Sequence, residues 1–373
     1  MIVNFDNAAT TFPKPLSVRK AVANAMEKFG GNAGRGGHAL AVRTSEAVFS
    51  ARETAAEFFG AEPENVVFTL NCTHSLNMAI QGIMQGGGNL IISSLEHNSS
   101  ARPAVKLASD KKITLSVAQV FPENEKTIRN FKSLIKSDTK AVVFTIASNV
   151  TGQITPYREI AQICREKNIC FIADSAQASG IINIKLSDGI NILCTAGHKG
   201  LYGITGTGLL VSDGKYKISP IIQGGTGTSS KSLKQPVLLP ESLESGTLNT
   251  AGIMSVKAGI EFINTIGIEN IFRHENILCN KFIKIITRNK KVTVYRNSNA
   301  EYVPIVAFNI GKIPPETVAE KLSDYGYCLR AGFHCSALAH IQLGTEYGCV
   351  RFSPSYFSRE EDTLRLAEII KNM

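Results

Sequence analysis

The sequence lacks the features that mark several classes of protein. Its 373 residues include no tryptophan, and none of its eight cysteines belongs to a Cys-x-x-Cys pair. Cysteines without a regular spacing, in a chain of this length, are typical of free thiols in a reducing compartment. No apolar run is long enough to span a bilayer, and residues 1–6 do not resemble a signal peptide. We therefore expect a cytoplasmic protein with no membrane segment.

Positive charge is present without the clustering that nucleic-acid binding needs. The formal net charge is +9, but the basic residues are dispersed, with only short pairs such as Lys111-Lys112. Without a long basic run or a tryptophan for base stacking, a solvated basic surface is the better interpretation, and no nucleic-acid partner is expected. Hydrophobic residues make up 43% of the chain and charged residues 19%, which is an ordinary globular balance.

Short apolar runs alternate with helical patterns between about residues 60 and 215. Strands are predicted at 66–70, 89–92, 141–146, 170–173, 190–195 and 208–211. Apolar strands separated by helices favour an α/β fold with a mostly parallel sheet covered on both faces. Residues 212–250 are rich in Gly, Ser, Thr and Pro and predict a long loop. We assign residues 15–252 to a large domain, and residues 1–14 and 253–373 to a smaller one.

Polar side chains follow the predicted strands at the points where the strands end. These residues are Thr73 and His74, Glu96 and His97, Asn149, Asp174, and His198 with Lys199. Because ligands of open α/β sheets sit beyond the carboxyl ends of the strands, we expect these side chains to meet at one edge of the sheet.

An aspartate and a lysine at consecutive strand ends predict a specific cofactor. Asp174 and Lys199 are separated by one predicted strand. A lysine there can form a Schiff base with the aldehyde of pyridoxal 5′-phosphate (PLP), and an aspartate can keep the pyridine nitrogen protonated. Gly203, Gly206 and Gly208 do not form the turn of a dinucleotide-binding motif, so NAD is not expected.

Several motifs together resemble one enzyme family. They are Asp6-Asn7-Ala8-Ala9-Thr10-Thr11, Glu96-His97-Asn98, Asp174-Ser175-Ala176-Gln177, Gly197-His198-Lys199 and Arg330-Ala331-Gly332-Phe333-His334-Cys335. From end to end, the chain resembles the class V, fold-type I PLP enzymes, and within them the cysteine desulfurases of the selenocysteine lyase-like branch. The resemblance implies a mostly parallel sheet of the seven-stranded type between helices, with a smaller α+β C-terminal domain.

The resemblance also implies roles around PLP. Lys199 would carry the Schiff base and act as base at the substrate Cα, Asp174 would pair with the pyridine nitrogen, and Gln177 would donate to the ring oxygen. His97 would stack on the ring, although it could instead only cap a helix. Asn149 would contact the cofactor and substrate. The phosphate would be held by Thr73, His74, Thr195 and His198, and by Thr247 of a neighbouring subunit, which implies a homodimer with shared active sites. Relatives usually carry Gly-Thr-Thr where this chain has Cys72-Thr73-His74, which leaves the donor set open.

Cys335 decides the expected reaction. The thiol sits in a glycine-containing turn near Arg330, where an electropositive setting favours the thiolate. By resemblance it attacks the substrate sulfur, although it could be a spectator. Arg351 resembles the arginine that binds the substrate carboxylate, with a surface ion pair as the alternative, and Arg35 and Arg330 resemble further substrate-binding arginines. The other cysteines are expected to be mostly buried.

We therefore expect a cysteine desulfurase that converts L-cysteine to L-alanine and leaves a persulfide on Cys335 for an acceptor. Three alternatives remain: a selenocysteine lyase, a class V aminotransferase or β-lyase acting on another amino acid, and a non-catalytic scaffold. The acceptor and the pathway, for example iron–sulfur cluster assembly, are open. Because the Cys335 loop looks short, an activating partner protein is a further hypothesis. No metal site is expected.

Overall fold

A seven-stranded sheet forms the centre of the fold, with the strand order β2-β8-β7-β6-β5-β3-β4. The computed structural model describes residues 2–34, 36–228 and 231–373. The strands of this sheet are β2 (Val66–Thr69), β3 (Asn89–Ser93), β4 (Thr114–Ala118), β5 (Thr139–Thr145), β6 (Cys170–Asp174), β7 (Ile192–Ala196) and β8 (Gly208–Ser212). Neighbouring strands from β7 through β4 are parallel, and only β8 runs antiparallel to its neighbours. The expected α/β fold is confirmed.

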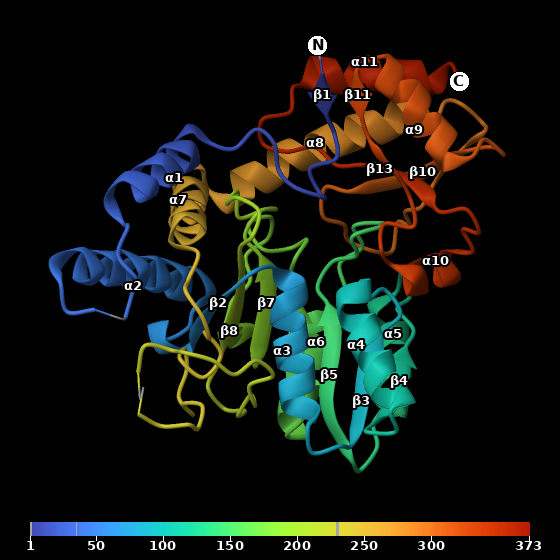
Figure 1. The fold of residues 1–373 in the computed structure, drawn as a ribbon. Helices are drawn as coiled ribbons and strands as arrows, with labels where there is room; N and C mark the ends of the chain where they lie inside the picture. Colours follow the sequence, from blue (N-terminus) through green and yellow to red (C-terminus); the bar gives the residue numbers. More distant parts are fainter. Residues whose placement is uncertain (1, 35, 229–230) are drawn as a thin grey trace.

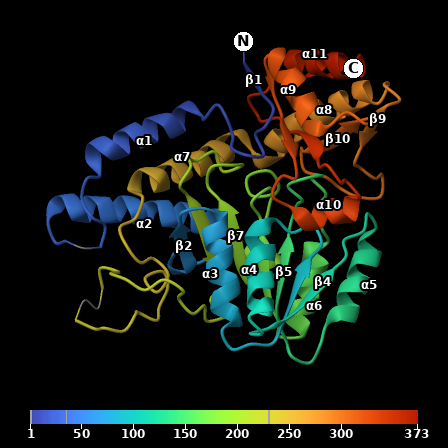
Figure 2. The same cartoon turned by 45° about the vertical axis from the view of Figure 1, so that its right-hand side comes forward.

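Helices cover both faces of this sheet because its central strands are apolar on both sides. One face packs against α3 (Cys72–Met84) and α4 (Asn98–Ser109). The other face packs against α2 (Ala39–Phe59), α5 (Asn124–Leu134), α6 (Tyr157–Glu166) and α7 (Thr250–Ile266). Figure 2 shows α3 and α4 in front of the strands, and α1 (Leu16–Lys28) beside α7.

The C-terminal part builds a second, smaller sheet with its own core. Its antiparallel strands lie in the order β12-β13-β10-β9. They are β9 (Val292–Val294), β10 (Val306–Ile310), β12 (Arg330–Gly332) and β13 (Cys349–Phe352), and they lie with α8 (Ile268–Ile286), α9 (Pro315–Asp324), α10 (Ala337–Leu343) and α11 (Glu360–Lys371). Phe282 stacks on Phe352 in this core with ring centroids 4.0 Å apart.

The N-terminus of the chain joins this C-terminal part. Strand β1 (Val3–Asn4) pairs in parallel with β11 (Tyr327–Cys328), and both chain ends lie at the top of Figure 1. Grouping residues 1–14 with 253–373 remains a proposal that this pairing supports. Helix α7 bridges the proposed division, since it begins at Thr250 and packs against α1 and α2. No helix within the described ranges is long and apolar enough to cross a membrane.

A buried ion pair anchors the long loop that precedes α7. Between Ser212 and Thr250 the described residues form only turns, bends and irregular segments. Glu244 in this loop makes a bidentate pair with Arg52 of α2, with both N–O distances 2.8 Å, and its Oε1 also accepts the amide of Phe68 at 2.7 Å. Each of the paired side chains is only 7% exposed. The pair therefore fixes the loop to the edge of the central sheet.

We predict that Arg52→Met lowers the free energy of unfolding by about 3–5 kcal/mol, because it leaves the Glu244 carboxylate buried without its cation. Urea denaturation followed by circular dichroism measures this change. Lys126→Met, which removes an exposed pair with Glu123, is the control and should leave the midpoint unchanged. The double variant Arg52→Met/Glu244→Gln should be more stable than Arg52→Met alone, and a double variant that is no more stable would contradict the assignment.

Candidate active site

The strand ends of the central sheet meet around one pocket. Its empty volume is about 640 Å³, which includes space open to solvent. The lining residues are Asn71, Cys72, Thr73, His97, Ser99, Thr145, Ala147, Asn149, Asp174, Ala176, Gln177, Ala196, His198 and Lys199. The structure thus brings together seven of the fourteen predicted site residues in one lining, because parallel strands deliver their following loops to the same edge.

Lys199 and Asp174 share this pocket, since Asp174 is the last residue of β6 and Lys199 follows the end of the neighbouring β7. Burial lowers the pKa of the Lys199 ammonium, and the nearby Arg351 and Arg330 lower it further, against the opposing effects of Cys72 and Asp174. A lowered pKa leaves more of the amine in the neutral, nucleophilic form. Oδ1 of the buried Asp174 accepts the amide of Ala176 at 2.9 Å and the Cys72 thiol at 3.5 Å. These contacts fix the carboxylate beside the amine.

One end of the pocket is suited to an anion. Asn71 caps α3, with its Oδ1 accepting the amide of His74 at 2.9 Å, and Cys72 and Thr73 in the first turn line the pocket. A helix N-terminus presents amide groups and a positive dipole end. His198 lines the same pocket, and its Nδ1 is buried without a hydrogen-bond partner among the described residues. An orphaned imidazole nitrogen beside a helix N-terminus fits a phosphate.

Two predicted phosphate donors lie elsewhere. Side chains alternate along β7, so Cys194 and Ala196 belong to the α3 face of the sheet, while Leu193 belongs to the opposite face. Thr195 follows Leu193 by two residues and therefore points to that opposite face. Ala196 rather than Thr195 lines the pocket, and the Thr195 Oγ1 is buried without a hydrogen-bond partner among the described residues. Its contact with a phosphate stays a prediction. The side chain of His74 is not among the lining residues, and its Nδ1 accepts the amide of Leu70 at 3.3 Å.

His97 caps a helix and also lines the pocket. Its Nδ1 accepts the amide of Ser99 at 3.0 Å at the start of α4. Burial lowers the pKa of His97 to about 4, so the ring is neutral near pH 7. Because Nδ1 is an acceptor, the neutral ring carries its proton on Nε2. The two interpretations of this residue are therefore compatible, although stacking on a cofactor ring stays a prediction.

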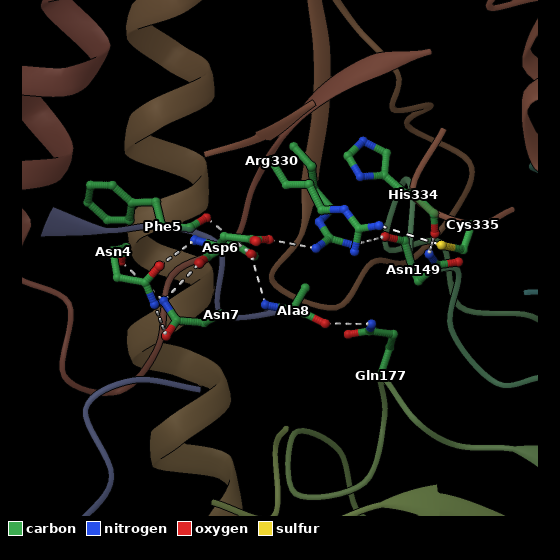
Figure 3. A network of polar contacts seen from close by, with 12 residues as sticks. Asn4, Phe5, Asp6, Asn7, Ala8, Asn149, Gln177, Arg330, His334 and Cys335 are labelled. Atoms are coloured by element: carbon green, nitrogen blue, oxygen red, sulfur yellow. Dashed lines mark hydrogen bonds and ion pairs between the residues drawn. The ribbon is translucent and has the colours of Figure 1, made fainter. Parts of the chain in front are cut away.

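The loop that carries Cys335 borders the pocket and is held by its neighbours (Figure 3). Asn149 donates through Nδ2 to the carbonyl of His334 at 2.7 Å and accepts the hydroxyl of Ser336 at 2.5 Å. The amide of Asn98 donates to the carbonyl of Cys335 at 2.8 Å. The sequence predicted Asn149 as a cofactor and substrate contact. Asn149 lines the pocket, and its side-chain amide is hydrogen-bonded to the residues on both sides of Cys335.

Cys335 is exposed and lies near a cation. Nη2 of Arg330 is 3.5 Å from its Sγ. Cys335 lines an adjacent groove together with Thr73, His97 and Ser99, which also line the pocket of Lys199. His334 and Cys335 have φ angles of 48° and 58°, in the left-handed region. Non-glycine residues adopt that region at an energetic cost, which is typical of functional sites.

The remaining cysteines are less accessible, as expected. Cys328 is partly buried, and the other six are buried: Cys72, Cys164, Cys170, Cys194, Cys279 and Cys349. Burial raises the pKa of each of these six thiols. A buried thiol of high pKa is a poor nucleophile, which leaves Cys335 as the candidate.

Arg351 is buried rather than on the surface, since it is only 1% exposed. Its Nη2 lies 2.7 Å from Oδ1 of Asp6, and its Nη1 donates to the carbonyl of Asn149 at 2.9 Å. Nε is buried and has no hydrogen-bond partner among the described residues. The contact with Asp6 was not foreseen, although Asp6 opens a motif that carried the family resemblance.

Of the remaining predicted residues, Arg330 and Arg351 are not among those that line the pocket, although both are near enough to lower the pKa of Lys199. Arg35 lies outside the described residues. Thr247 is exposed, and its hydroxyl accepts a hydrogen bond from Asn32 at 3.3 Å. Its contact with a neighbouring subunit stays a prediction.

Comparison with known proteins decides the family. A family model described as aminotransferase class-V matches residues 3–366. The chain belongs to the class-V aminotransferase family. A probable cysteine desulfurase of Methanothermobacter thermautotrophicus is 28% identical over 376 residues, covering 98% of this chain and 94% of that protein. The apo structure of cysteine desulfurase from Thermococcus onnurineus NA1 is 28% identical, with a TM-score of 0.91 over 100% of this chain and 94% of that one.

A more distant structure shows the same fold. Cysteine desulfurase CsdA of Escherichia coli is 23% identical, with a TM-score of 0.88 over 100% of this class-V chain and 94% of that chain. Members of this family are PLP-dependent. The pocket fits that cofactor, since it joins an amine of lowered pKa, a buried carboxylate and an anion-binding helix end with the orphaned Nδ1 of His198.

Exposure and charge predict that Cys335 is the thiol most reactive toward iodoacetamide in the native protein. Arg330→Met should slow its alkylation at pH 7 roughly five-fold, since a unit charge near 4 Å contributes about 1 kcal/mol even in water. Peptide mass spectrometry over time measures the rate at each cysteine. Arg273→Met, on α8, is the control. Equal rates in Arg330→Met and the wild type would contradict a role for Arg330 at the sulfur.

Glu96 gives the fold a pH dependence. Burial raises the pKa of Glu96 to about 8, and Asp174 adds to this, against hydrogen bonds from Ser100, Ser93 and the Thr145 amide. Because the folded-state pKa lies above the ordinary value of 4.5, folding favours the protonated form. The stability that it contributes is full below about pH 4.5 and is lost as the pH rises through about 8.

We therefore predict that Glu96→Gln flattens the pH dependence of the free energy of unfolding between pH 5 and pH 8.5. Urea denaturation at both pH values measures it, with the exposed Glu123→Gln as control. A wild type and a Glu96→Gln variant that lose stability equally over this range would show that Glu96 is ionised throughout.

Proposed function

We propose that the protein is a cysteine desulfurase, which removes sulfur from L-cysteine, releases L-alanine and holds the sulfur as a persulfide on Cys335. The observation that carries the proposal is the placement of the exposed Cys335 thiol, with Arg330 at 3.5 Å, beside the pocket of Lys199. An aminotransferase has no use for a nucleophilic thiol there, whereas sulfur removal needs one. The relatives named as cysteine desulfurases support the same conclusion.

PLP, when bound, supplies the electron sink that lets the substrate lose its Cα proton and its Sγ. Lys199 would hold the cofactor and then take the Cα proton on Nζ, for which the lowered pKa of its amine is suited. Asp174 would keep the ring nitrogen protonated, and Gln177 would donate to the ring oxygen. Thr73 and His198, with the amides of the α3 N-terminus, would hold the phosphate.

The sulfur step is a displacement in which Cys335 is the nucleophile. The thiolate attacks the substrate Sγ, an S–S bond forms, and the Cβ–Sγ bond breaks with its electron pair left on the carbon side. Cβ takes up one proton and Cα regains the proton that it lost, so that the substrate leaves as alanine. Arg330 stabilises the thiolate before the attack, and Asn149 holds the loop that presents it.

Arg351 would bind the substrate α-carboxylate, with Arg330 close by and Arg35 as a third candidate. A planar guanidinium can offer parallel N–H groups to a carboxylate, which an ammonium cannot. Asp6 and the Asn149 carbonyl fix Arg351, and its buried Nε, which has no partner among the described residues, would be satisfied by the substrate carboxylate.

The persulfide would pass to an acceptor thiol on a protein or a small molecule, and iron–sulfur cluster assembly is one candidate destination. A homodimer would bring Thr247 of one subunit to the phosphate of the other, and the anchoring of Glu244 near Thr247 supports a fixed loop there. A cytoplasmic location suits the free thiols. The same residues would act on L-selenocysteine, and the relative turnover of the two substrates measures the preference.

We predict that Cys335→Ala lowers sulfide release from L-cysteine by at least roughly 10³-fold, because it removes the nucleophile. The assay is sulfide and alanine production with dithiothreitol as acceptor. The variant should keep the absorbance of the bound cofactor, while Cys328→Ala, the matched control, should keep its activity. Full activity of Cys335→Ala would refute the assignment, and a wild type that produces no alanine from cysteine would refute the function.

A further inference from the structure

One short N-terminal segment touches residues on both sides of the active site. Residues 6–14, which we call the N-terminal strap, leave β1 and pass beside β13. The amide of Asn7 donates to the carbonyl of Ser353 at 3.2 Å, and the amide of Ala8 donates to Oγ of Ser353 at 3.0 Å. The strap therefore starts on the C-terminal part of the chain.

The strap then reaches the turn that carries Lys199. The hydroxyl of Thr11 donates to the carbonyl of Lys199 at 2.6 Å, and its amide donates to the carbonyl of His198 at 3.2 Å. Nζ of Lys14 donates to the same carbonyl of His198 at 2.7 Å. Thr10 adds a hydroxyl contact to it at 3.2 Å. The backbone of this turn is thus held from outside the central sheet.

Two of these strap residues are enclosed by the fold. Burial lowers the pKa of Lys14 to about 8, so its ammonium loses hydration in the folded chain and depends on the carbonyl of His198 as a partner. Thr11 is only 4% exposed, so its hydroxyl also depends on its protein partner.

The strap also contacts Gln177, which lines the pocket, and Arg351. The carbonyl of Ala8 accepts from Nε2 of Gln177 at 3.0 Å (Figure 3). Asp6 pairs with Arg351 at 2.7 Å. A single segment thus links the lysine turn, the cofactor-contacting amide and the substrate-binding arginine.

We propose that Thr11 and Lys14 are positioning residues, which act through the His198 and Lys199 carbonyls to place the Lys199 amine for cofactor attachment and proton transfer. The proposal rests on the role of Lys199 in the proposed function and deepens it. A lysine side chain has several rotatable bonds, so its amine is placed accurately only when its backbone is fixed. Small displacements matter, because a shift of about 1 Å at a reacting atom can slow a reaction about 10²-fold.

The test measures attachment of the cofactor without any substrate. Apo-protein is mixed with PLP, samples are reduced with borohydride at intervals, and mass spectrometry follows the label on Lys199. Thr11→Val and Lys14→Met should each slow labelling roughly 10- to 100-fold, and Thr11→Ser, which keeps the hydroxyl, should label close to the wild-type rate. The controls are Lys20→Met on α1 and Thr265→Val on α7, both exposed, and they should match the wild type.

Each outcome decides the question. Labelling of Thr11→Val and Lys14→Met at the wild-type rate overturns the proposal, as does a Thr11→Ser variant that is as slow as Thr11→Val. Circular dichroism gives the folded fraction of each apo-variant, and a rate that falls only in proportion to this fraction assigns the strap a purely structural role. Failure of the proposed function is seen separately, as a wild type that is labelled at Lys199 but releases no sulfide from cysteine.

Discussion

The common direction of the central strands is the constraint on which the rest of the structure depends. β2, β3, β5, β6 and β7 all deliver their carboxyl ends to one edge, and the loops that follow carry the pocket residues. Helices α3 and α4 begin at that same edge, so their positive dipole ends lie there as well. The backbone at this edge therefore attracts an anion, and the side chains of His198 and Lys199 add further polar groups to the same site.

The site gathers three cationic side chains, Lys199, Arg330 and Arg351, of which Arg351 is buried. Burial is the main cause that lowers the pKa of both Lys199 and Arg351, and the nearby Arg330 lowers each further. Asp174 opposes this effect at Lys199, and Asp6 opposes it at Arg351. A ligand that brings a carboxylate and a phosphate completes the balance, which is the charge pattern of an amino acid bound to PLP.

Sequence patterns predicted the elements that local periodicity determines. They did not predict contacts between residues that are far apart in the sequence. The apolar runs of β3, β5, β6 and β7 predicted the parallel sheet, but β4 was missed because its edge position leaves Thr114 exposed and breaks the apolar run. Thr195 does not join Ala196 in the pocket lining because adjacent residues of a strand face opposite ways. The pair between Asp6 and Arg351 joins residues 345 positions apart. The hydrogen bond from Asn149 to the His334 carbonyl joins residues 185 positions apart. No local pattern encodes either contact.

The left-handed backbone at His334 and Cys335 has a consequence for how sulfur leaves the enzyme. The amide of Asn98 and the side chain of Asn149 fasten the loop on both sides of the thiol. A persulfide on Cys335 would then move mainly by rotation of the cysteine side chain. Under the proposed function, these contacts restrict the travel of the loop, so an acceptor would bring its thiol to the groove that Cys335 lines.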